Sequence, residues 1–583
     1  MLAYATRMRG EFGTVPRILR IRGLSLNSRY NEDVAACDAG SIVTTKTVDE
    51  CQSWEEVLDL IRMSEQEIRL GGGETAVERQ HEKGRLTARE RIERLIDPGS
   101  TFFELGLFAA FEMYQEWGGA AAAGVITGIG QVQKRHFMII ANDATVKAGA
   151  FFPTTVKKVL RAQHISLENH LPLIYLVDSA GVFLPLQDEV FPDENDFGRI
   201  FRYNARISAQ GIPQIAAIMG SCVAGGAYLP VMCDKILMTE GSGLYIAGPS
   251  LVKAAIGQDL DSEDLGGAQL HSTLSGTIDF REKTDKSCLD RVGRLVGTLA
   301  KPSQAPFQRV EAQPPDHSPE EIYDLMPLDP SQEYDVLKIF QCIFDNSEFM
   351  EYKAEYGKTL ICGYARLAGW SVGVVANRKQ HIKTPDGPFE VGGVIYRESA
   401  DKAARFVMDC NQSRIPLLFF QDVSGFMVGR EAEISGIIKS GAKLVNVVAN
   451  SVVPKITVIM GGSYGAGNYA LCGKAYDPRF IFAWPTCRYA VMGGKQAAKT
   501  LLALKVRQLE KKDQKITEEA RQQMLESIQA TYDHQLDPRY GAARLWVDRI
   551  IQPHQTREAL QLSLEVAALN PQVPEFKTGV LQV

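Results

Sequence analysis

The chain contains two similar segments about 240 residues apart, and this repeat constrains its fold more than any other feature. Residues 213–228 read PQIAAIMGSCVAGGAY and residues 454–469 read PKITVIMGGSYGAGNY. Aligned without a gap, the segments place Gly225 and Gly226 on Ala466 and Gly467. A repeat at so long a spacing indicates a duplicated domain, because solenoid repeats recur every 20 to 50 residues or so.

Three further pairs of segments repeat in the same order. LPLIYLVDSAGVF (171–183) matches IPLLFFQDVSGFM (415–427), which aligns Asp178 with Asp422 and Gly181 with Gly425. The other pairs are IIAND (139–143) with VVANR (374–378) and LIDPGSTFFE (95–104) with IFDNSEFME (343–351). Two copies of one fold, each with a Gly-rich turn after an apolar strand, suggest one active site assembled from two similar halves.

The composition excludes several classes of protein. A net charge of −6 gives no basic surface for nucleic acid. No run of 18 apolar residues occurs, so we expect no membrane span. The ten cysteines include no C-x-x-C pair, which disfavours a zinc ribbon or a disulfide framework and favours buried free thiols. We therefore expect a soluble intracellular protein.

The first 24 residues differ from the rest of the chain. They contain five arginines, no lysine and one acidic residue, Glu11. An Arg-rich, acid-poor leader is typical of a mitochondrial transit peptide, which would place the protein in the mitochondrial matrix. A disordered leader, or a start codon assigned too early, is the alternative and would make the protein cytoplasmic.

The coarse pattern indicates an α/β fold. Between residues 123 and 300, short β-branched runs such as HFMIIAND and LPLIYLVD alternate with helical stretches, which predicts a parallel sheet covered on both faces. TARE (87–90) predicts a capping box at the start of a helix. Five prolines between 302 and 319 indicate a linker before the second copy. Residues 502–532 form a long charged helical stretch with a solvated face.

The repeated glycine turns carry the clearest chemical signal. Each follows an apolar strand and precedes a predicted helix, so consecutive backbone N–H groups can point into one cavity with the helix dipole behind them. Two such donors form an oxyanion hole, which stabilises a developing enolate or tetrahedral oxyanion by several kcal/mol. Tight packing of the helix against the strand is the alternative interpretation of a single turn.

The usual catalytic side chains are missing. The sequence has no H-E-x-x-H and no phosphate-binding G-x-x-x-x-G-K-[ST], and no histidine recurs between the halves. Asp178 and Asp422 do recur, but an aspartate between a parallel strand and a Gly turn is more often a helix cap than a base. His271 is also interpreted as structural. The sequence thus predicts a chain that stabilises an oxyanion while another molecule supplies the base.

These motifs resemble a known family. VDSAGVFLPLQDEVFPD, GSCVAGGAYLPVM, AGPSLVKAAIGQDLDSEDLGGAQLH, GFMVGRE, GGSYGAGNYALCGKAYDPRF and VMGGKQAA resemble the carboxyltransferase (beta) subunits of biotin-dependent acyl-CoA carboxylases, most closely the 3-methylcrotonyl-CoA type. The resemblance implies tandem crotonase/ClpP-like domains (β-β-α superhelix) at 25–310 and 316–560, with a tail at 561–583. It also implies a hexamer of beta subunits, with active sites between the N-domain of one subunit and the C-domain of another.

The resemblance further implies the chemistry. Carboxybiotin on a partner biotin carboxylase/biotin carrier (alpha) subunit releases CO2, and the freed ureido nitrogen deprotonates the acyl-CoA. This chain has no Met-Lys-Met motif for its own biotin, and we expect no metal. By motif, Gly225 and Gly226 are expected to form the biotin hole, and Ala466 and Gly467 the enolate hole; the opposite assignment of the two ligands is the alternative. The candidates for the acyl-CoA and biotin pocket are Ala180, Gly181, Gly248, Gly425, Phe426, Asn468 and Tyr469.

Two departures leave the substrate open. RKQHIKTPDGPFEVGGVIY (378–396) is longer than the NNGVLF-like turn expected there and could border the CoA or biotin entrance, and SAGVFLP (179–185) replaces SGGAYLP. Other acyl-CoA carboxylases, such as the propionyl-CoA type, and a glutaconyl-CoA decarboxylase remain alternatives. A crotonase-type hydratase or isomerase would need carboxylates facing the hole, and no glutamate is duplicated beside the turns. A non-catalytic scaffold would not need two donor turns.

Overall fold

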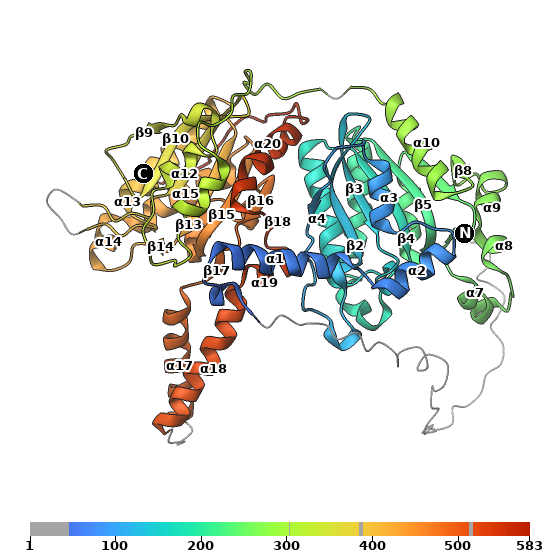
Figure 1. Ribbon diagram of the computed structural model, residues 1–583, viewed down its shortest axis with the longest axis horizontal. Coiled ribbons are helices and arrows are strands. Elements are labelled where there is room, and N and C mark those ends of the chain that lie inside the picture. Colours follow the sequence, from blue (N-terminus) through green and yellow to red (C-terminus); the bar gives the residue numbers. More distant parts are fainter. Residues whose placement is uncertain (1–45, 302, 384–388, 512–516, 583) are drawn as a thin grey trace, which may run out of the picture. The chain divides into compact units, whose positions relative to one another are not determined.

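The computed structural model describes residues 46–301, 303–383, 389–511 and 517–582 (Figure 1). The predicted leader, residues 1–24, lies outside the described residues. Residues Thr47–Val583 form one compact unit, whose described part contains two eight-stranded sheets and one two-stranded sheet. Each large sheet belongs to one copy of the repeat.

The two large sheets have the same strand order, which confirms the duplication. The first runs β1-β2-β3-β4-β5-β6-β8, and the second runs β9-β10-β11-β13-β15-β16-β18; β7 pairs with β5, and β17 pairs with β15. The first sheet comprises β1 (Phe103–Leu105), β2 (Val125–Val132), β3 (Arg135–Asn142), β4 (Leu173–Ser179), β5 (Gln214–Val223), β6 (Lys235–Thr239), β7 (Gly243–Tyr245) and β8 (Phe280–Glu282). The second comprises β9 (Met350–Tyr352), β10 (Leu360–Leu367), β11 (Trp370–Asn377), β13 (Leu417–Val423), β15 (Lys455–Tyr464), β16 (Phe480–Ala483), β17 (Arg488–Ala490) and β18 (Arg549–Ile550).

The prediction of a wholly parallel sheet was wrong at one edge. From β3 to β8 and from β11 to β18 the strands are parallel, but β1, β2 and β3 pair antiparallel, as do β9, β10 and β11. The reason lies in the connections. β2 and β3 are joined by the two residues Gln133 and Lys134, and so short a link permits only a hairpin.

One aspartate holds the hairpin turn in each half. Asp97 accepts hydrogen bonds from the N–H groups of Gln133 (2.8 Å) and Lys134 (2.6 Å). Asp345 accepts from Ala368 and Gly369, both at 2.8 Å, in the turn between β10 and β11. These two carboxylates occupy matching places in the sequence repeat, so the duplication extends to individual hydrogen bonds.

Helices cover both sheets (Figure 1). The capping box predicted at TARE is confirmed, since Thr87 and Glu90 bond reciprocally at the start of α3. The charged stretch at 502–532 falls in two helices, α17 and α18, rather than one. The helices are α1 (Trp54–Arg69), α2 (Glu74–Glu82), α3 (Ala88–Leu95), α4 (Pro153–Asn169), α5 (Phe197–Ala209), α6 (Tyr228–Val231), α7 (Pro249–Ile256), α8 (Ser262–Gly266), α9 (Ala268–Thr273), α10 (Asp285–Thr298), α11 (Ile322–Leu325), α12 (Val336–Gln341), α13 (Arg397–Gln412), α14 (Arg430–Ser435), α15 (Ile437–Asn450), α16 (Gly465–Ala470), α17 (Gly494–Glu510), α18 (Glu518–Leu536), α19 (Pro538–Ala543) and α20 (Thr556–Ala567).

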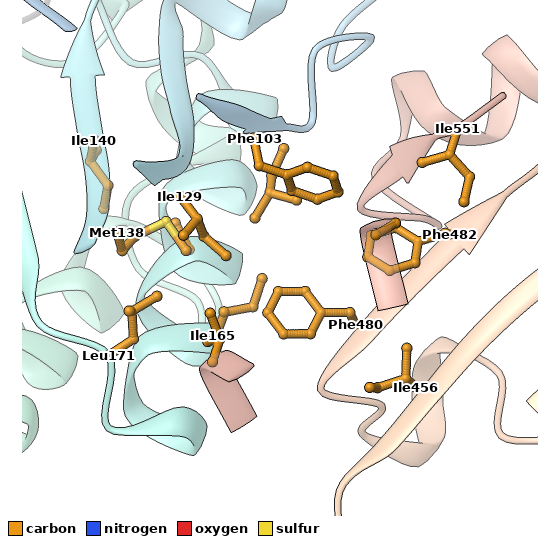
Figure 2. Close-up of a cluster of buried hydrophobic side chains, with 14 of the residues drawn as sticks. Phe103, Ile129, Met138, Ile140, Ile165, Leu171, Ile456, Phe480, Phe482 and Ile551 are labelled. Carbon is orange, nitrogen blue, oxygen red and sulfur yellow. The ribbon is translucent and has the colours of Figure 1, made fainter. Parts of the chain in front are cut away.

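The two halves share a continuous apolar core (Figure 2). Phe103 of β1 packs edge-to-face on Phe482 of β16, with ring centroids 5.8 Å apart, and Phe482 stacks on Phe480. At the margin of this core Arg161 of α4 makes two hydrogen bonds to the buried carboxylate of Asp548, at 2.8 and 2.7 Å. Burial of aromatic surface fixes one half against the other, and the ion pair adds directional contacts.

No helix among the described residues is both long and apolar enough to cross a lipid bilayer.

Candidate active site

Both repeated turns lie at the ends of central strands and share one backbone shape. β5 ends at Val223 and is followed by a 3₁₀ turn, Ala224–Ala227, that leads into α6. β15 ends at Tyr464 and leads directly into α16. The first residue of each bend is left-handed, Ala224 with φ 57° and Gly465 with φ 52°. An alanine tolerates this conformation only at some cost, so the bend is imposed by the surrounding structure.

The predicted hole residues occupy matching positions just after these bends. Gly225 and Gly226 lie in the turn after β5, and Ala466 and Gly467 lie in the first turn of α16. The first N–H groups of a helix have no partner within that helix, and they carry its positive dipole end. Both turns can therefore present donors to an oxyanion, which is the chemistry of enolate stabilisation.

A bulge in the neighbouring strand pairing explains the shape of each turn. β4 and β5 are in register at Val177 and Ile218, but the next pair is Ser179 with Cys222, so β5 carries two extra residues. β13 and β15 repeat this shift between Gln421–Ile459 and Val423–Ser463. Extra residues leave backbone donors without ladder partners, and each such donor needs another acceptor.

The repeated aspartates supply that acceptor. Asp178 Oδ1 accepts from Ser221 N at 3.1 Å, and Asp422 Oδ1 accepts from Gly462 N at 2.8 Å. A Cβ on the preceding residue, Gly220 or Gly461, would overlap the carboxylate at 2.0 and 2.6 Å respectively. The prediction that these aspartates cap helices was wrong, because the N–H groups they accept from belong to the strands β5 and β15.

Each buried aspartate is matched by a cation, but from a different element. Arg91 of α3 reaches Asp178 at 3.2 Å and Asp285 at 2.8 Å, and all three side chains are buried. Burial raises the pKa of Asp178, although Arg91 opposes that shift. Asp422 pairs with Lys379 and accepts from Tyr334 Oη, each at 3.1 Å. Burial, together with the Asp422 charge, holds the pKa of Tyr334 well above its ordinary value.

The C-terminal turn also contains the pattern G-x-S-x-G at residues 461–465, which in hydrolases marks a nucleophilic serine. Ser463 does not have the surroundings of a nucleophile. Its buried hydroxyl donates to Gln421 Oε1 at 2.6 Å and accepts from Asn468 Nδ2 at 2.7 Å. Within the described residues no histidine is hydrogen-bonded to it, so Ser463 braces the turn.

The remaining predicted pocket residues are placed around the two turns. Ala180 and Gly181 follow β4 directly, and Gly248 is the N-cap of α7. Gly425 and Phe426 form β14, which pairs with β12 (Val394–Ile395). Tyr469 of α16 is 49% exposed, and its counterpart in the first half, Tyr228, is 51% exposed. His271, interpreted as structural, is held between Leu244 O and Ser275 Oγ.

The described residues at the two ends of the 378–396 segment form a closed excursion from a chain path that both halves share. Gly393 N donates to Arg378 O at 2.8 Å, so the chain leaves and returns at one point, and Ile382 pairs with Glu390 further out. Gly393 is left-handed and lies against Asp422 O, as Gly149 lies against Asp178 O in the first half. The excursion is therefore defined as residues 379–392, and the equivalent first-half loop is residues 144–148.

Across the described residues no group of three or more His, Cys, Asp or Glu side chains has a geometry that could hold a metal ion.

Comparison with known proteins places the chain in a family. The carboxyl transferase domain family matches residues 79–581. The chain belongs to this family. It is 47% identical to the biotin-dependent 3-methylcrotonyl-coenzyme A carboxylase beta1 subunit of Mycobacterium tuberculosis, over 86% of this chain and 92% of that one. It is also 45% identical to the probable mitochondrial methylcrotonoyl-CoA carboxylase beta chain of Drosophila melanogaster, over 89% of this chain and 90% of the relative.

The fold agrees with a solved carboxyltransferase. The beta subunit of Pseudomonas aeruginosa geranyl-CoA carboxylase superposes with a TM-score of 0.78 at 35% identity, covering 91% of this chain and 96% of that chain. The α/β crotonase-like prediction and the recognition of a carboxyltransferase beta subunit are both confirmed.

Proposed function

We propose that this chain transfers the carboxyl group of carboxybiotin, carried by a partner alpha subunit, to 3-methylcrotonyl-CoA, giving 3-methylglutaconyl-CoA in leucine degradation. The observation that supports the proposal is the duplicated turn with its bulge and buried aspartate, because each turn can present backbone donors to an oxyanion. A 3-methyl-2-enoyl thioester loses a γ proton to give an extended enolate, and backbone donors at the thioester oxygen stabilise it. The relatives named above support this acyl group.

Each half of the chain receives one role. Residues 25–310, of which 46–301 and 303–310 lie in the described part of the chain, are assigned to the N-terminal domain, in which Gly225 and Gly226 hold the ureido oxygen of biotin. Residues 316–560 form the C-terminal domain, in which Ala466 and Gly467 hold the enolate oxygen. Asp178 and Asp422 are buried against cations and strand amides, so the proton acceptor is the biotin nitrogen rather than a side chain.

A second copy of the chain completes each site. Both halves expose large apolar side chains. In the first half they lie on α7 and in the loop after β4, and in the second half on α14, on α15 and in the loop after β14. These side chains are Leu184, Phe191, Leu251, Val428, Ile434 and Ile438. Clustered exposed apolar side chains mark interaction surfaces. An arrangement of N-domains against C-domains buries them, in a homo-hexameric core that docks the biotin carboxylase/biotin carrier (alpha) subunit.

Geranyl-CoA is the second candidate substrate, because the solved structure described above is a geranyl-CoA carboxylase subunit. Geranyl-CoA and 3-methylcrotonyl-CoA are both 3-methyl-2-enoyl thioesters and differ in the length of the chain beyond the methyl group. The reacting atoms are the same in both, so the two oxyanion holes serve either one. Chain length alone separates the candidates.

The deciding experiment is carboxylation of a panel of acyl-CoA thioesters by the complex with its biotinylated partner. We expect kcat/KM to be highest for 3-methylcrotonyl-CoA. A preference for geranyl-CoA would change the acyl group, and a preference for propionyl-CoA would remove the 3-methyl-2-enoyl assignment. Streptavidin blotting of the isolated chain should be blank, and a covalent signal at its 64.3 kDa would contradict a separate biotin carrier.

We propose mitochondrial import for the leader at residues 1–24. Relatives in Drosophila melanogaster and Arabidopsis thaliana are named as mitochondrial proteins. Mature protein purified from its host should then begin after the leader, and deletion of residues 1–24 should leave activity and assembly unchanged. Recovery of the intact N-terminus would favour the cytoplasmic alternative.

A further inference from the structure

The excursion at 379–392 begins with a lysine that points inward. Lys379 is only 13% exposed, and its Nζ lies 3.1 Å from each oxygen of Asp422, whose side chain is 5% exposed. The backbone at this point is fixed, because a Cβ on Gly392 would lie 1.9 Å from Lys379 O. The closed neck of the excursion therefore holds Lys379 against the aspartate that supports the C-terminal turn.

In the first half, the cation that pairs with the equivalent aspartate comes from another element. When LIDPGSTFFE is aligned with IFDNSEFME, Arg91 of α3 corresponds to Ile339 of α12. Ile339 is fully buried in the apolar core and has no charge to offer Asp422. A helix that supplies a cation in one half thus supplies a core residue in the other, and the C-terminal half needs its cation from elsewhere.

The other charged and titratable groups near Asp422 do not replace Lys379. Tyr334 donates one hydrogen bond, and burial raises the pKa of Tyr464 to about 12, so both phenols are neutral at physiological pH. Arg488 lines a small cavity together with Lys379 and Asp422, but it pairs with Asp49. Among the described residues, Lys379 makes the one ion pair with Asp422.

We propose that Lys379 is a positioning residue for the C-terminal oxyanion hole. Lys379 holds the Asp422 carboxylate in the orientation that accepts from Gly462 N, which keeps the bulge of β15 in place ahead of Ala466 and Gly467. Without it, a buried carboxylate with no cation would turn toward water and draw Gly462 with it. A shift of about 1 Å in a reacting geometry can cost on the order of 100-fold in rate.

The inference rests on the proposed function, and the test uses the complete carboxylase complex. Lys379→Met should lower kcat by about 10- to 100-fold while KM for the acyl-CoA stays within about threefold, because the substrate still binds and the hole is misaligned. Lys379→Arg should restore kcat to within about threefold, since a guanidinium can also pair with the carboxylate. Lys383→Met is the matched control, because Lys383 is an exposed lysine of the same excursion, and it should behave as wild type.

A double variant keeps the proposal testable if Lys379→Met assembles poorly. Lys379→Met with Asp422→Asn removes both charges while an amide oxygen still accepts from Gly462 N, so its kcat should exceed that of Lys379→Met. A wild-type kcat for Lys379→Met, or no gain in the double variant, would overturn the role of Lys379. Absence of carboxyl transfer by the wild-type complex on every thioester would instead overturn the proposed function.

Discussion

The N-terminal and C-terminal turns have one backbone design and two different supports. In both, a bulged central strand directs an N–H to a buried aspartate, and a left-handed residue starts the bend. The cation, however, comes from α3 as Arg91 in the first half and from the excursion as Lys379 in the second. What the two halves share is therefore the bulge and its carboxylate, and the source of the compensating charge is free to differ.

The turns also differ in how much space surrounds the second glycine. A Cβ added to Gly226 would have only Gly181 Cα within contact range, at 4.0 Å. A Cβ added to Gly467 would lie 2.5 Å from Val423 Cγ2. The glycine in the first half is thus free of packing constraints, whereas the glycine in the second half is also required by the core.

The largest expected effect is on the free energy of unfolding, and it should differ between removal of Arg91 and removal of Lys379. Arg91→Met leaves two buried carboxylates, Asp178 and Asp285, without their cation, so we expect unfolding free energy to fall by about 3–5 kcal/mol. Lys379→Met should cost clearly less, because Asp422 keeps Tyr334 and Gly462 as donors and Lys379 is partly solvated. Denaturant unfolding of both variants measures this, and equal losses would contradict the difference in support.

Valine at the two glycines should separate catalysis from packing. Gly226→Val and Gly467→Val should each lower carboxyl transfer by about 10²–10³-fold, because the side chain crowds the donors. Only Gly467→Val should also lower the free energy of unfolding, by about 1–3 kcal/mol, because its side chain would overlap Val423. Activity is compared with thermal unfolding of the same samples; a stable and active Gly226→Val would show that the first turn is not a hole.

The ion pair of Arg161 with Asp548 joins the two halves away from both turns, so its effect on stability can be compared with the effects of the two turns. Burial opposes ionisation of Asp548, but Arg161 and Lys474 more than offset it and hold the pKa of this carboxyl well below its ordinary value. A lowered folded-state pKa contributes stability above the unfolded-state pKa, about 3.9, and this contribution is lost as pH falls below it. Wild type should therefore lose this contribution of Asp548 to stability on acidification.

Asp548→Asn tests that contribution. The variant should be less stable than wild type at pH 7, and the gap should narrow as pH falls below about 4. Denaturant unfolding across this pH range provides the measurement. If the difference in unfolding free energy between wild type and the variant does not change with pH, the side chain of Asp548 stabilises the fold by packing rather than through its ion pair with Arg161.

The smallest expected effect concerns the substrate. Each misplaced methyl or methylene in an apolar pocket costs about 1–3 kcal/mol, so discrimination between acyl chains should be about 10- to 200-fold. We expect kcat/KM to rank 3-methylcrotonyl-CoA above propionyl-CoA, with acetyl-CoA last. Substitution of Tyr469, but not of Tyr228, should alter this ranking if the enolate lies at the C-terminal turn, and the reverse result would exchange the roles of the two halves.

Much of the fold could be predicted from local sequence. Apolar runs, the capping box at Thr87 and the Gly-rich turns depend on neighbouring residues, so they indicated the strands, a helix start and the bends correctly. The repeat also predicted the order of elements in the second half. The antiparallel edge was missed because alternating strands and helices dominated the pattern, although the two-residue link at Gln133 and Lys134 was visible in the sequence.

The roles of Asp178 and Asp422 could not be predicted in the same way. Their position after a strand and before a glycine is compatible with a helix cap, and only the shifted register of β5 and β15 brings strand N–H groups to them. Strand register results from packing between strands distant in sequence. For the same reason the G-x-S-x-G pattern alone could not exclude a nucleophile, whereas the contacts of Ser463 do.

The sequence alone was enough to predict the duplication, the α/β class, the positions of the two turns and the family, because these depend on composition, order and local spacing. Which cation meets each aspartate became known only from the folded structure. Arg91 lies in the helix α3, far before Asp178 in the sequence, and Lys379 lies in the excursion before Asp422. No sequence periodicity links either cation to its aspartate. Charge pairing in a buried site depends on distances across the folded core, which the order of residues along the chain does not contain.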